Sequence, residues 1–287
     1  MAEHPDDAPI LTPEVVAHYA SGYEEQRLTA RSDQIEMHRT QELLARYLPP
    51  APAVILDVGG GPGVHALWLA RRGYTVHLVD ALPLHVDLAR AASARQSDAP
   101  LASVALGDAR HLDRADASAD AVLLLGPLYH LTARDDRLAA LGEARRVVRP
   151  GGVVLAVGIS RYATTLDMLF RGLLADPAAA AIAEQDRRDG QHRNPTNHPE
   201  LFTTVFLHHP DDLRAEVAAA GLRCNALLGI EGPAWLSSWA REHWGDAATH
   251  ERLMDMLRAI EAEPTLLGVS AHLMAVARKP DTDAATR

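Results

Sequence analysis

The apolar positions of this chain change their spacing in a regular way over the first 160 residues. Short apolar runs predict five buried strands, at residues 53–57, 75–79, 101–106, 121–125 and 153–157. Between them, apolar residues recur every three or four positions, which predicts helices at residues 64–72 and 83–94 and another one that Thr132 caps. Strands that alternate with helices favour a parallel sheet with helices on both faces.

The pattern differs on either side of this block. Before it, residues 15–48 read as one helix that Pro49-Pro50 ends. After it, residues 161–210 contain a predicted helix at 164–174, an alanine-rich stretch and a polar loop at 189–200. The core pattern then resumes, with helices predicted at residues 211–220 and 235–261 and strands at 222–228 and 271–278.

The place of residues 161–210 in the chain suggests what they do. This insertion follows the fifth strand, so we expect it over the carboxyl edge of the sheet, where open α/β sheets bind ligands. We therefore predict a helical lid that covers a substrate. A helical excursion that takes no part in the site is the alternative.

Composition and charge narrow the classes of protein. A length of 287 residues fits one large domain, or one domain with an insertion. The single cysteine, Cys224, allows no internal disulfide and no cysteine-based zinc site, which favours a reducing compartment, and we expect a cytoplasmic protein. The net charge of −10 argues against non-specific binding to nucleic acid or to an anionic membrane. The acidic N-terminus predicts no signal peptide, and no apolar run reaches the roughly 18 residues of a membrane span.

The strongest chemical signal is the glycine-rich turn at residues 59–63, between the first predicted strand and its helix. Glycines let the backbone approach a ligand closely, and the free amides at the start of a helix suit an anion or a carboxylate. Asp80 ends the second strand about twenty residues further on, where a carboxylate can accept both hydroxyls of a ribose. The alternatives are a merely flexible turn and an acid that starts the helix before Pro83.

The same glycines leave a second ligand class open. Gly61, Gly63 and Ala66 also fit the fingerprint of nicotinamide dinucleotides, so an oxidoreductase is an alternative. However, Asp57 precedes the loop, and its carboxylate would repel a pyrophosphate. Asp57 is better suited to positioning loop amides or to pairing with an ammonium group. The residues therefore favour a nucleoside without a pyrophosphate.

Residues 54–63 resemble motif I of the class I S-adenosylmethionine-dependent methyltransferases. Asp80 matches the ribose-binding acid of that family, and residues 107–109 match the segment that reads the adenine edge. Residues 123–130 resemble the exit of the fourth strand near the methyl group, and residues 146–152 resemble the turn into the fifth strand. The resemblance covers about residues 19–158, with these motifs in the expected order.

The resemblance implies an α/β fold with a doubly wound, mostly parallel seven-stranded sheet, the Rossmann-like methyltransferase fold, and S-adenosylmethionine as cofactor. Residues 1–48 would form a helical cap over the cofactor, residues 49–160 the nucleotide-binding half of the core, and residues 211–287 the rest of the sheet. An aromatic residue of the cap, Tyr19 or Tyr23, would close over the cofactor, and Arg27 would meet its carboxylate, although simple packing is the alternative for all three. The cofactor-binding residues expected are Tyr19, Tyr23, Arg27, Asp57, Gly59, Gly60, Gly61, Asp80, Ala81, Asp108, Ala109, Leu125 and Gly126.

Methyl transfer asks mainly for alignment of the nucleophile with the methyl group, and a base matters only when the nucleophile arrives protonated. Tyr129 and His130 leave the fourth strand at a suitable place, with a turn tyrosine and a helix-entry histidine as the alternative. His198 is the third catalytic candidate, from a polar group in the insertion that also includes His192, Asn194, Asn197, His208 and His209. Most histidines in such a segment are merely solvated, and we expect no metal site.

Three tryptophans follow the insertion. Trp235 and Trp239 lie four residues apart, and Trp244 follows them. Core packing is the prediction for all three, and an aromatic wall for an apolar substrate is the alternative.

The sequence thus predicts an enzyme that methylates an N, O or C atom of a small molecule. The alanine-rich composition, with more arginine than lysine, is typical of high-GC bacteria, in which such enzymes often serve secondary metabolism. A peptide or protein acceptor is one alternative, and a nucleoside-binding member that transfers no methyl group is another. The partner expected is a small-molecule methyl acceptor, with no nucleic acid and no membrane, for a monomer or a homodimer.

Overall fold

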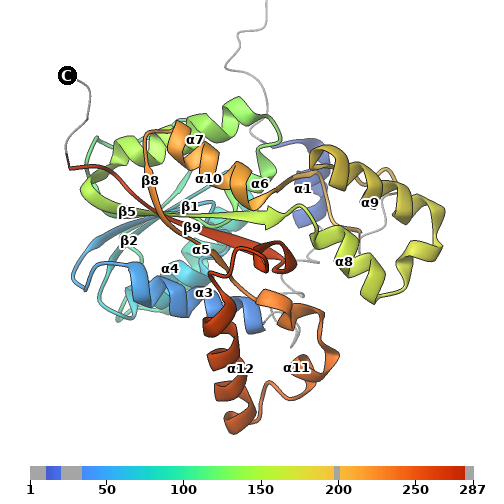
Figure 1. Ribbon diagram of the computed structural model, residues 1–287. Coiled ribbons are helices and arrows are strands. Elements are labelled where there is room, and N and C mark those ends of the chain that lie inside the picture. Colours follow the sequence, from blue (N-terminus) through green and yellow to red (C-terminus); the bar gives the residue numbers. More distant parts are fainter. Residues whose placement is uncertain (1–10, 21–33, 197–200, 282–287) are drawn as a thin grey trace, which may run out of the picture.

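The computed structural model describes residues 11–20, 34–196 and 201–281, and a twisted β-sheet forms its centre (Figure 1). Seven strands follow one another across the sheet in the order β3-β2-β1-β4-β5-β9-β8, and the first five are parallel. β9 runs antiparallel to both of its neighbours. Their bounds are β1 Val54–Val58, β2 Thr75–Asp80, β3 Ser103–Leu106, β4 Ala119–Leu124, β5 Val148–Ser160, β8 Arg223–Gly229 and β9 His272–Arg278.

Two short strands of the insertion extend this sheet to nine strands in the described part of the chain. β7 (Val205–His208) pairs in parallel with Ile159 and Ser160, the last residues of β5, and β6 (Gln191–His192) pairs antiparallel with β7. One edge of β5 pairs with β9 as far as Ile159, and the opposite edge pairs with β4 as far as Ala156. β7 therefore continues the edge of β5 that β4 occupies earlier in the strand. The predicted seven strands are present, and the insertion that we expected to be helical adds two more.

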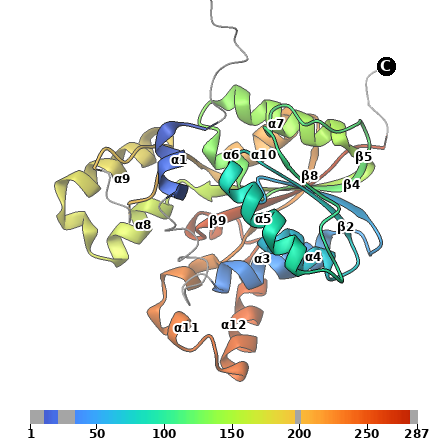
Figure 2. The ribbon, with the colours of Figure 1, turned by 180° about the vertical axis from the view of Figure 1, so that it is seen from behind.

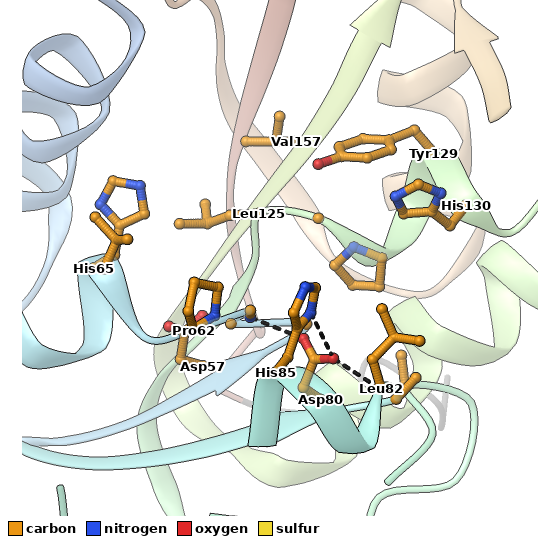
Figure 3. A pocket seen from close by; sticks show the side chains of 18 of the residues that line it. Asp57, Pro62, His65, Asp80, Leu82, His85, Leu125, Tyr129, His130 and Val157 are labelled. Atoms are coloured by element: carbon orange, nitrogen blue, oxygen red, sulfur yellow. Dashed lines mark hydrogen bonds and ion pairs between the residues drawn. The ribbon is translucent and has the colours of Figure 1, made fainter. Parts of the chain in front are cut away.

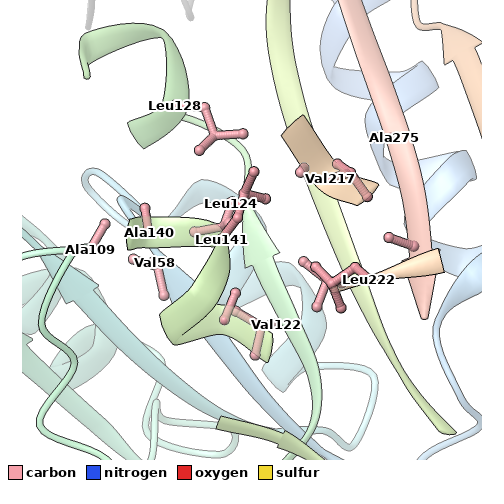
Figure 4. Close-up of a cluster of buried hydrophobic side chains, with 14 of the residues drawn as sticks. Val58, Ala109, Val122, Leu124, Leu128, Ala140, Leu141, Val217, Leu222 and Ala275 are labelled. Carbon is pink, nitrogen blue, oxygen red and sulfur yellow. The ribbon is translucent and has the colours of Figure 1, made fainter. Parts of the chain in front are cut away.

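Helices cover both faces of the sheet (Figures 1 and 2). One face carries α3 (Gln34–Tyr47), α4 (Val64–Ala70) and α5 (Pro83–Arg95), and the other carries α6 (Pro127–His130), α7 (Arg134–Val147) and α10 (Pro210–Ala219). The strands contribute alternate residues to the two cores, as strand geometry requires. Val122 and Leu124 join the core under α6, α7 and α10, which Figure 4 shows, whereas Ala121 and Leu123 join the core under α3, α4 and α5.

Two helical segments extend beyond these layers. The insertion contributes α8 (Ala163–Phe170), the 3-10 turn η3 (Leu173–Ala175) and α9 (Pro177–Asp189), and α1 (Pro13–Ala20) lies beside them in both views. After β8 come η5 (Gly232–Leu236), α11 (Ser238–Glu242) and α12 (Ala247–Ile260), which pack on α3, and then η6 (Leu267–Val269). No helix among the described residues is both long and apolar enough to cross a lipid bilayer.

Three predicted helices differ from the observed ones. The single helix expected over residues 15–48 is described as two, α1 and α3, and residues 21–33 lie outside the description. Thr132 caps nothing, since α7 begins at Arg134 after Ala133 and has no side-chain cap; the short helix α6, with Pro127 at its first position, precedes it. Residues 235–261 are not one helix, because the side chain of Asp246 starts α12 afresh by accepting a hydrogen bond from the amide of Thr249.

Candidate active site

A cavity of about 220 Å³ opens at the carboxyl ends of β1, β2 and β4 (Figure 3). The structure brings to its wall every predicted site residue that it describes. These residues are Tyr19, Asp57, Gly59, Gly60, Gly61, Asp80, Ala81, Asp108, Ala109, Leu125, Gly126, Tyr129 and His130. The other three predicted residues, Tyr23, Arg27 and His198, lie outside the described residues.

The glycine-rich turn forms the floor of this cavity. Gly59, Gly61 and Gly63 have φ angles of 69°, 56° and 90°, which side chains rarely adopt. A Cβ atom at Gly59 would also lie 2.8 Å from Cδ of Pro127. The amide of Gly59 donates to the carbonyl of Val79 at 2.7 Å, which fixes the turn against β2. Glycine is therefore required here for both conformation and space.

Asp80, the last residue of β2, fixes the other side of the turn. One carboxylate oxygen accepts the amide of Gly61 at 2.8 Å, and the other accepts the amide of Leu82 at 2.9 Å and lies 3.2 Å from Nδ1 of His85. Asp80 does not start a helix, because α5 begins at Pro83 and has no acid in its first turn. A carboxylate offers about four lone-pair sites, so the buried Asp80 retains capacity for the hydroxyls of a ligand.

Asp57 in β1 is a buried acid, 1% exposed, that faces the same cavity. Burial, and then the charge of Asp80, raise the pKa of Asp57 to about 7. Its Oδ1 accepts no hydrogen bond within the described structure. The expected role in positioning loop amides is not observed, because Val79 and Asp80 take those amides. This orphaned carboxylate fits the second expectation, an ammonium group supplied by a ligand.

Aromatic side chains close the cavity on the side of the N-terminal helix. The hydroxyl of Tyr19 in α1 lies 2.8 Å from Nε2 of His130 in α6, within hydrogen-bond distance. The ring of Tyr19 also meets that of His85 edge to face, with 5.0 Å between centroids. Tyr129 and His130 point into the cavity from α6, as Figure 3 shows. The resemblance had implied such an aromatic residue from the N-terminal region.

Asp108 and Ala109 follow β3 and line the cavity at the side of the sheet. The Asp108 carboxylate accepts the amide of Arg110 at 2.8 Å and pairs with its guanidinium at 2.7 Å. These contacts hold the Asp108 side chain in a fixed position at the edge of the cavity.

The sequence analysis missed several residues of the cavity wall. Glu36 and Thr40 reach it from α3, His65 from α4, and Val157 and Ile230 from β5 and the segment after β8. Burial lowers the pKa of His65 to about 4, so its ring stays neutral near pH 7. Their spacing along the helices and strands gave no signal of a cavity.

Two histidines that the sequence offered as possible substrate contacts make structural contacts. His192 in β6 lies 2.8 Å from Asp186 of α9 through Nδ1 and 2.8 Å from the carbonyl of Leu201 through Nε2. His208 in β7 is fully buried and lies 3.3 Å from Glu216 of α10. Both histidines therefore hold the insertion together or to the core, and the idea that they are solvated loop residues was wrong. Asn194 and His209 line neither the cavity at the glycine turn nor the second cavity described below, and Asn197 lies outside the described residues.

The tryptophans have three different environments. Trp244 packs in the core between α3 and α12, as expected. Trp239 is 51% exposed, so core packing was the wrong prediction there. Trp235 donates from its ring nitrogen to the carbonyl of Val269 at 2.8 Å and lines a second cavity.

This second cavity, of about 700 Å³, lies between α8, β7, η5, α11 and the start of β9. Its wall is mostly apolar, with Ile159, Met168, Phe202 and Trp235 among its residues. It adjoins the first cavity, because Glu36 lines both. Residues close together in the sequence also line different cavities. Val157 and Ile230 line the first cavity, whereas Ile159 and Glu231 line the second.

Known proteins share both the sequence motifs and the fold. Residues 55–152 match the family model described as a methyltransferase domain, which includes Asp57, the glycine turn and Asp80. The chain is 32% identical over 207 residues to methyltransferase GfsG of Streptomyces halstedii, an alignment that covers 70% of this chain and 66% of that protein. Through residues 55–152, the chain belongs to the class I S-adenosylmethionine-dependent methyltransferase family. This membership confirms the fold and the cofactor that the sequence predicted.

Solved structures of the methyltransferase fold agree with this assignment. The Burkholderia thailandensis 1,6-didemethyltoxoflavin-N1-methyltransferase, solved with its substrate and S-adenosylhomocysteine, aligns with a TM-score of 0.55 over 98% of this chain and 92% of its own, at 18% identity. The [4+2]-cyclase SpnF aligns with a TM-score of 0.54 over 85% of this chain and 82% of its own, at 19% identity. At such identities the likeness concerns the fold alone. This chain spans just under two thirds of the length of GfsG, at 66%.

Removal of the Asp80 carboxylate is expected to weaken binding of S-adenosylmethionine by tenfold or more. Hydrogen bonds to a charged group contribute about 1.5–3 kcal/mol each, and Asp80→Ala would remove those to the ribose and also release the amide of Gly61. Isothermal titration calorimetry measures the affinity. Asp87→Ala, on the exposed face of α5, is the matched control and should bind normally. An Asp80→Ala protein with unchanged affinity would exclude Asp80 from the binding site.

Proposed function

We propose that the protein transfers the methyl group of S-adenosylmethionine to a nucleophilic atom of a small, largely apolar molecule. The observation that carries this proposal is the pair of adjoining cavities, one at the glycine turn and one of about 700 Å³ under the insertion. A volume of that size is typical of sites for compounds of drug-like dimensions. The shared wall at Glu36 would bring the two reactants together.

The first cavity has groups that match each part of the cofactor. Asp80 would accept the ribose hydroxyls, Asp57 would pair with the ammonium group, and the segment at Asp108 would meet the adenine edge. Tyr19 and His130 would close over the bound molecule, since their contact joins α1 to α6 across the cavity. In this role His130 would exclude water and fix the orientation of the bound cofactor. We therefore propose that His130 and Tyr129, which the sequence suggested as catalytic groups, position the reactants instead.

The chemistry requires little more than alignment. The sulfonium supplies a methyl group that is already electrophilic, so the protein must hold a nucleophile in line with it and keep water out. The apolar wall of the second cavity would do both for an acceptor that fills it. The insertion between residues 161 and 210 would then act as the cover that the sequence predicted.

A small acceptor is favoured over a peptide because the second cavity, between α8, η5 and α11, has a volume of about 700 Å³, which suits a small molecule. The Burkholderia neighbour, which was solved with 1,6-didemethyltoxoflavin bound, supports the same choice. The composition that is typical of high-GC bacteria makes a secondary metabolite the substrate class we propose. SpnF, a cyclase with a similar fold, favours a second candidate, in which the chain binds the cofactor and transfers no methyl group.

Release of S-adenosylhomocysteine separates these candidates. The wild-type protein should produce it when incubated with S-adenosylmethionine and a panel of hydroxylated and aminated aromatic acceptors. A protein that binds the cofactor but releases none with any acceptor would contradict methyl transfer to a small molecule and favour the second candidate.

Filling the second cavity should block the acceptor and spare the cofactor. Ala163 begins α8, is 8% exposed and lines this cavity, so Ala163→Phe would place a ring in it. We expect turnover to fall at least tenfold while the affinity for S-adenosylmethionine changes less than twofold. Ala178→Phe, at an exposed position of α9, is the control for a phenylalanine in the insertion. Equal loss of cofactor binding and turnover would mean that the second cavity is not a separate site.

A further inference from the structure

A hydrogen-bonded group of polar residues interrupts the apolar wall of the second cavity. His272 is the first residue of β9, Glu231 precedes η5, and Glu36 belongs to α3. One side-chain atom of each lies within 4.8 Å of the other two. All three line the second cavity, and Glu36 lines the first as well. The roles proposed above for the cofactor do not use Glu231 or His272.

Glu231 is built to hold His272 in one orientation. The carboxylate is 2% exposed; one oxygen accepts the Ser270 hydroxyl at 2.9 Å and the His272 amide at 3.0 Å. The other oxygen lies 2.5 Å from Nδ1 of His272. The Ser270 hydroxyl oxygen in turn accepts the amides of Glu231 and Gly232, each at 3.1 Å. Such a network leaves the carboxylate no freedom to rotate away from the imidazole.

These contacts determine which imidazole nitrogen carries the proton. Burial alone would raise the pKa of Glu231, but the charge of His272 and the hydrogen bonds to it keep that pKa below its ordinary value. An ionised carboxylate only accepts hydrogen bonds, so Nδ1 must be the donor. In the neutral imidazole, Nε2 then carries the lone pair, which is the form of histidine that accepts a proton.

The register of the sheet places His272 close to the first cavity. His272 pairs with Ile159 of β5, and Val157, two residues earlier on that strand, lines the first cavity. At about 3.3 Å per residue, the two positions are separated by roughly 7 Å along the strand. Other charged groups of the second cavity are Asp167 and Arg171 of α8, His192 of β6 and Arg241 of α11. His192 also has a buried carboxylate partner, Asp186, but it belongs to β6, which pairs with β7 and not with β5 beside Val157.

We propose that His272, oriented by Glu231, is the general base that removes the proton from a hydroxyl group of the acceptor. This inference rests on the proposed function and specifies oxygen as the methylated atom. The hydroxyl proton passes to Nε2 of His272 as the new oxygen–methyl bond forms. The sulfur–methyl bond breaks, its electron pair stays on sulfur, and S-adenosylhomocysteine leaves. Glu231 and Glu36, whose oxygens lie 2.5 and 3.9 Å from Nδ1, stabilise the imidazolium until the proton passes to water.

The same three residues are of the types that bind a divalent cation. A cation bound through Nδ1 would have to displace the hydrogen bond from His272 to Glu231, and the Glu231 carboxylate already accepts three donors. The contacts therefore favour a base over a metal ligand. Metal binding serves as a contrary outcome of the test.

The first test reads the tautomer without any acceptor. The full-length protein is labelled with [15N]histidine, and long-range proton–nitrogen correlation spectra are recorded at pH 8 with and without S-adenosylmethionine; His272→Gln assigns the signals. We expect a protonated Nδ1 and an unprotonated Nε2 for His272. A protonated Nε2 would overturn the proposal. So would loss of the Nδ1–H signal on addition of Mg²⁺ or Mn²⁺, because the group would then be a metal site.

The second test uses two phenolic acceptors of similar shape, a naphthol and a nitronaphthol that is already ionised at the assay pH. With the naphthol, whose pKa is near the value of about 10 for tyrosine, His272→Gln and Glu231→Gln should lower turnover at least 100-fold. With the ionised phenol the same variants should recover to within about tenfold of wild type, because no proton has to be removed. Affinity for S-adenosylmethionine should not change. His243→Gln, an exposed histidine of the segment after α11, is the matched control.

Other outcomes would refute the base and can be told apart. An equal loss with both phenols would make His272 structural, and a loss in His130→Gln but not in His272→Gln would move the base to α6. Absence of S-adenosylhomocysteine with the wild-type protein and every acceptor would refute the proposed function itself. In that case the nitrogen spectra would still report whether the imidazole has the tautomer of a base.

Discussion

Replacement of Arg137 by methionine is expected to lower the free energy of unfolding by about 3–5 kcal/mol, because it leaves a buried carboxylate without its cation. Arg137 in α7 is 2% exposed and binds Glu216 of α10 through two nitrogens, at 2.9 and 2.7 Å. A third nitrogen donates to the carbonyl of Leu131 at 2.8 Å, and the guanidinium lies 3.7 Å from the centroid of the Phe206 ring. One side chain thus joins two core helices, the end of α6 and the strand β7 of the insertion.

Urea denaturation at pH 7 would measure this loss. Arg134→Met is a closely matched control: Arg134 belongs to the same helix and lies 4.0 Å from the same carboxylate, but its side chain is 56% exposed. Exposed ion pairs contribute about 0–1 kcal/mol, so this control should unfold almost as the wild type does. If both variants lost the same small amount, the Arg137 pair would be no more important than a surface contact.

The same pair makes stability depend on pH in a defined window. Burial opposes ionisation of Glu216, but hydrogen bonds and charges from His208 and Arg137 bring its pKa down to about 2. A carboxyl whose pKa is lowered by folding stabilises the protein at pH values above its ordinary pKa. This contribution is lost as the pH falls toward the pKa of the folded state. The wild type should therefore lose stability between about pH 4.5 and pH 2. Arg137→Met should lose less stability over the same window, because the pKa of Glu216 rises toward its ordinary value and the folded state no longer favours the ionised form.

Cofactor affinity is expected to fall about tenfold between pH 8 and pH 6, and Asp57→Asn should abolish this dependence. The pKa of Asp57 is raised to about 7, so the carboxylate is mostly ionised at pH 8 and mostly protonated at pH 6. Pairing with the ammonium group of S-adenosylmethionine requires the ionised form. Asp57→Asn should bind at least tenfold more weakly at pH 8, with an affinity that no longer varies over this range.

The cofactor-free protein should respond in the opposite way. A carboxyl whose pKa is raised by folding makes the protein less stable as the pH increases from its unfolded value, about 4, to its folded value, about 7. Asp57→Asn removes this buried charge and should increase the melting temperature at pH 8, while it weakens cofactor binding. Asp113→Asn, an exposed position, serves as the control for both measurements. If affinity in the wild type did not vary between pH 6 and pH 8, Asp57 would not contact the ammonium group.

The sequence predicted which residues meet at the first cavity because parallel strands end at one edge of a sheet. Asp57 and Asp80 lie near the carboxyl ends of neighbouring strands, and the register that pairs Asp57 with Leu78 brings both acids to the same cavity. The acceptor side could not be predicted in this way. Glu36, Glu231 and His272 come from three distant segments, and only the packing of α3 against η5 and β9 makes them neighbours.

The insertion shows a different limit of sequence analysis. His192 and His208 looked like exposed polar residues because their partners, Asp186 and Glu216, lie six and eight residues away on elements whose relative orientation no periodicity reveals. A buried histidine needs a hydrogen-bond partner. An acid six or eight residues away is only a weak indication of such a pair, because the tertiary fold decides whether the two side chains meet. Thr132 was also predicted wrongly as a helix cap. The short helix α6, which begins at Pro127, ends just before it, and α7 begins only at Arg134.

The attachment of the insertion to β5 determines how this protein could be re-engineered. β7 belongs to the main sheet, whereas α8, η3 and α9 pack mainly on a small core of their own around Met168, Ala179 and Ile182. A graft that exchanges residues 163–189 for the corresponding segment of a relative would change the roof of the acceptor cavity and leave the sheet hydrogen bonds at Ser160 and the Arg137 contacts intact. A graft that also took residues 205–208 would cut through the sheet. Chimeras with altered acceptor range should therefore fold when their junctions lie at Arg161 and Gly190, and fail when they lie beyond β7.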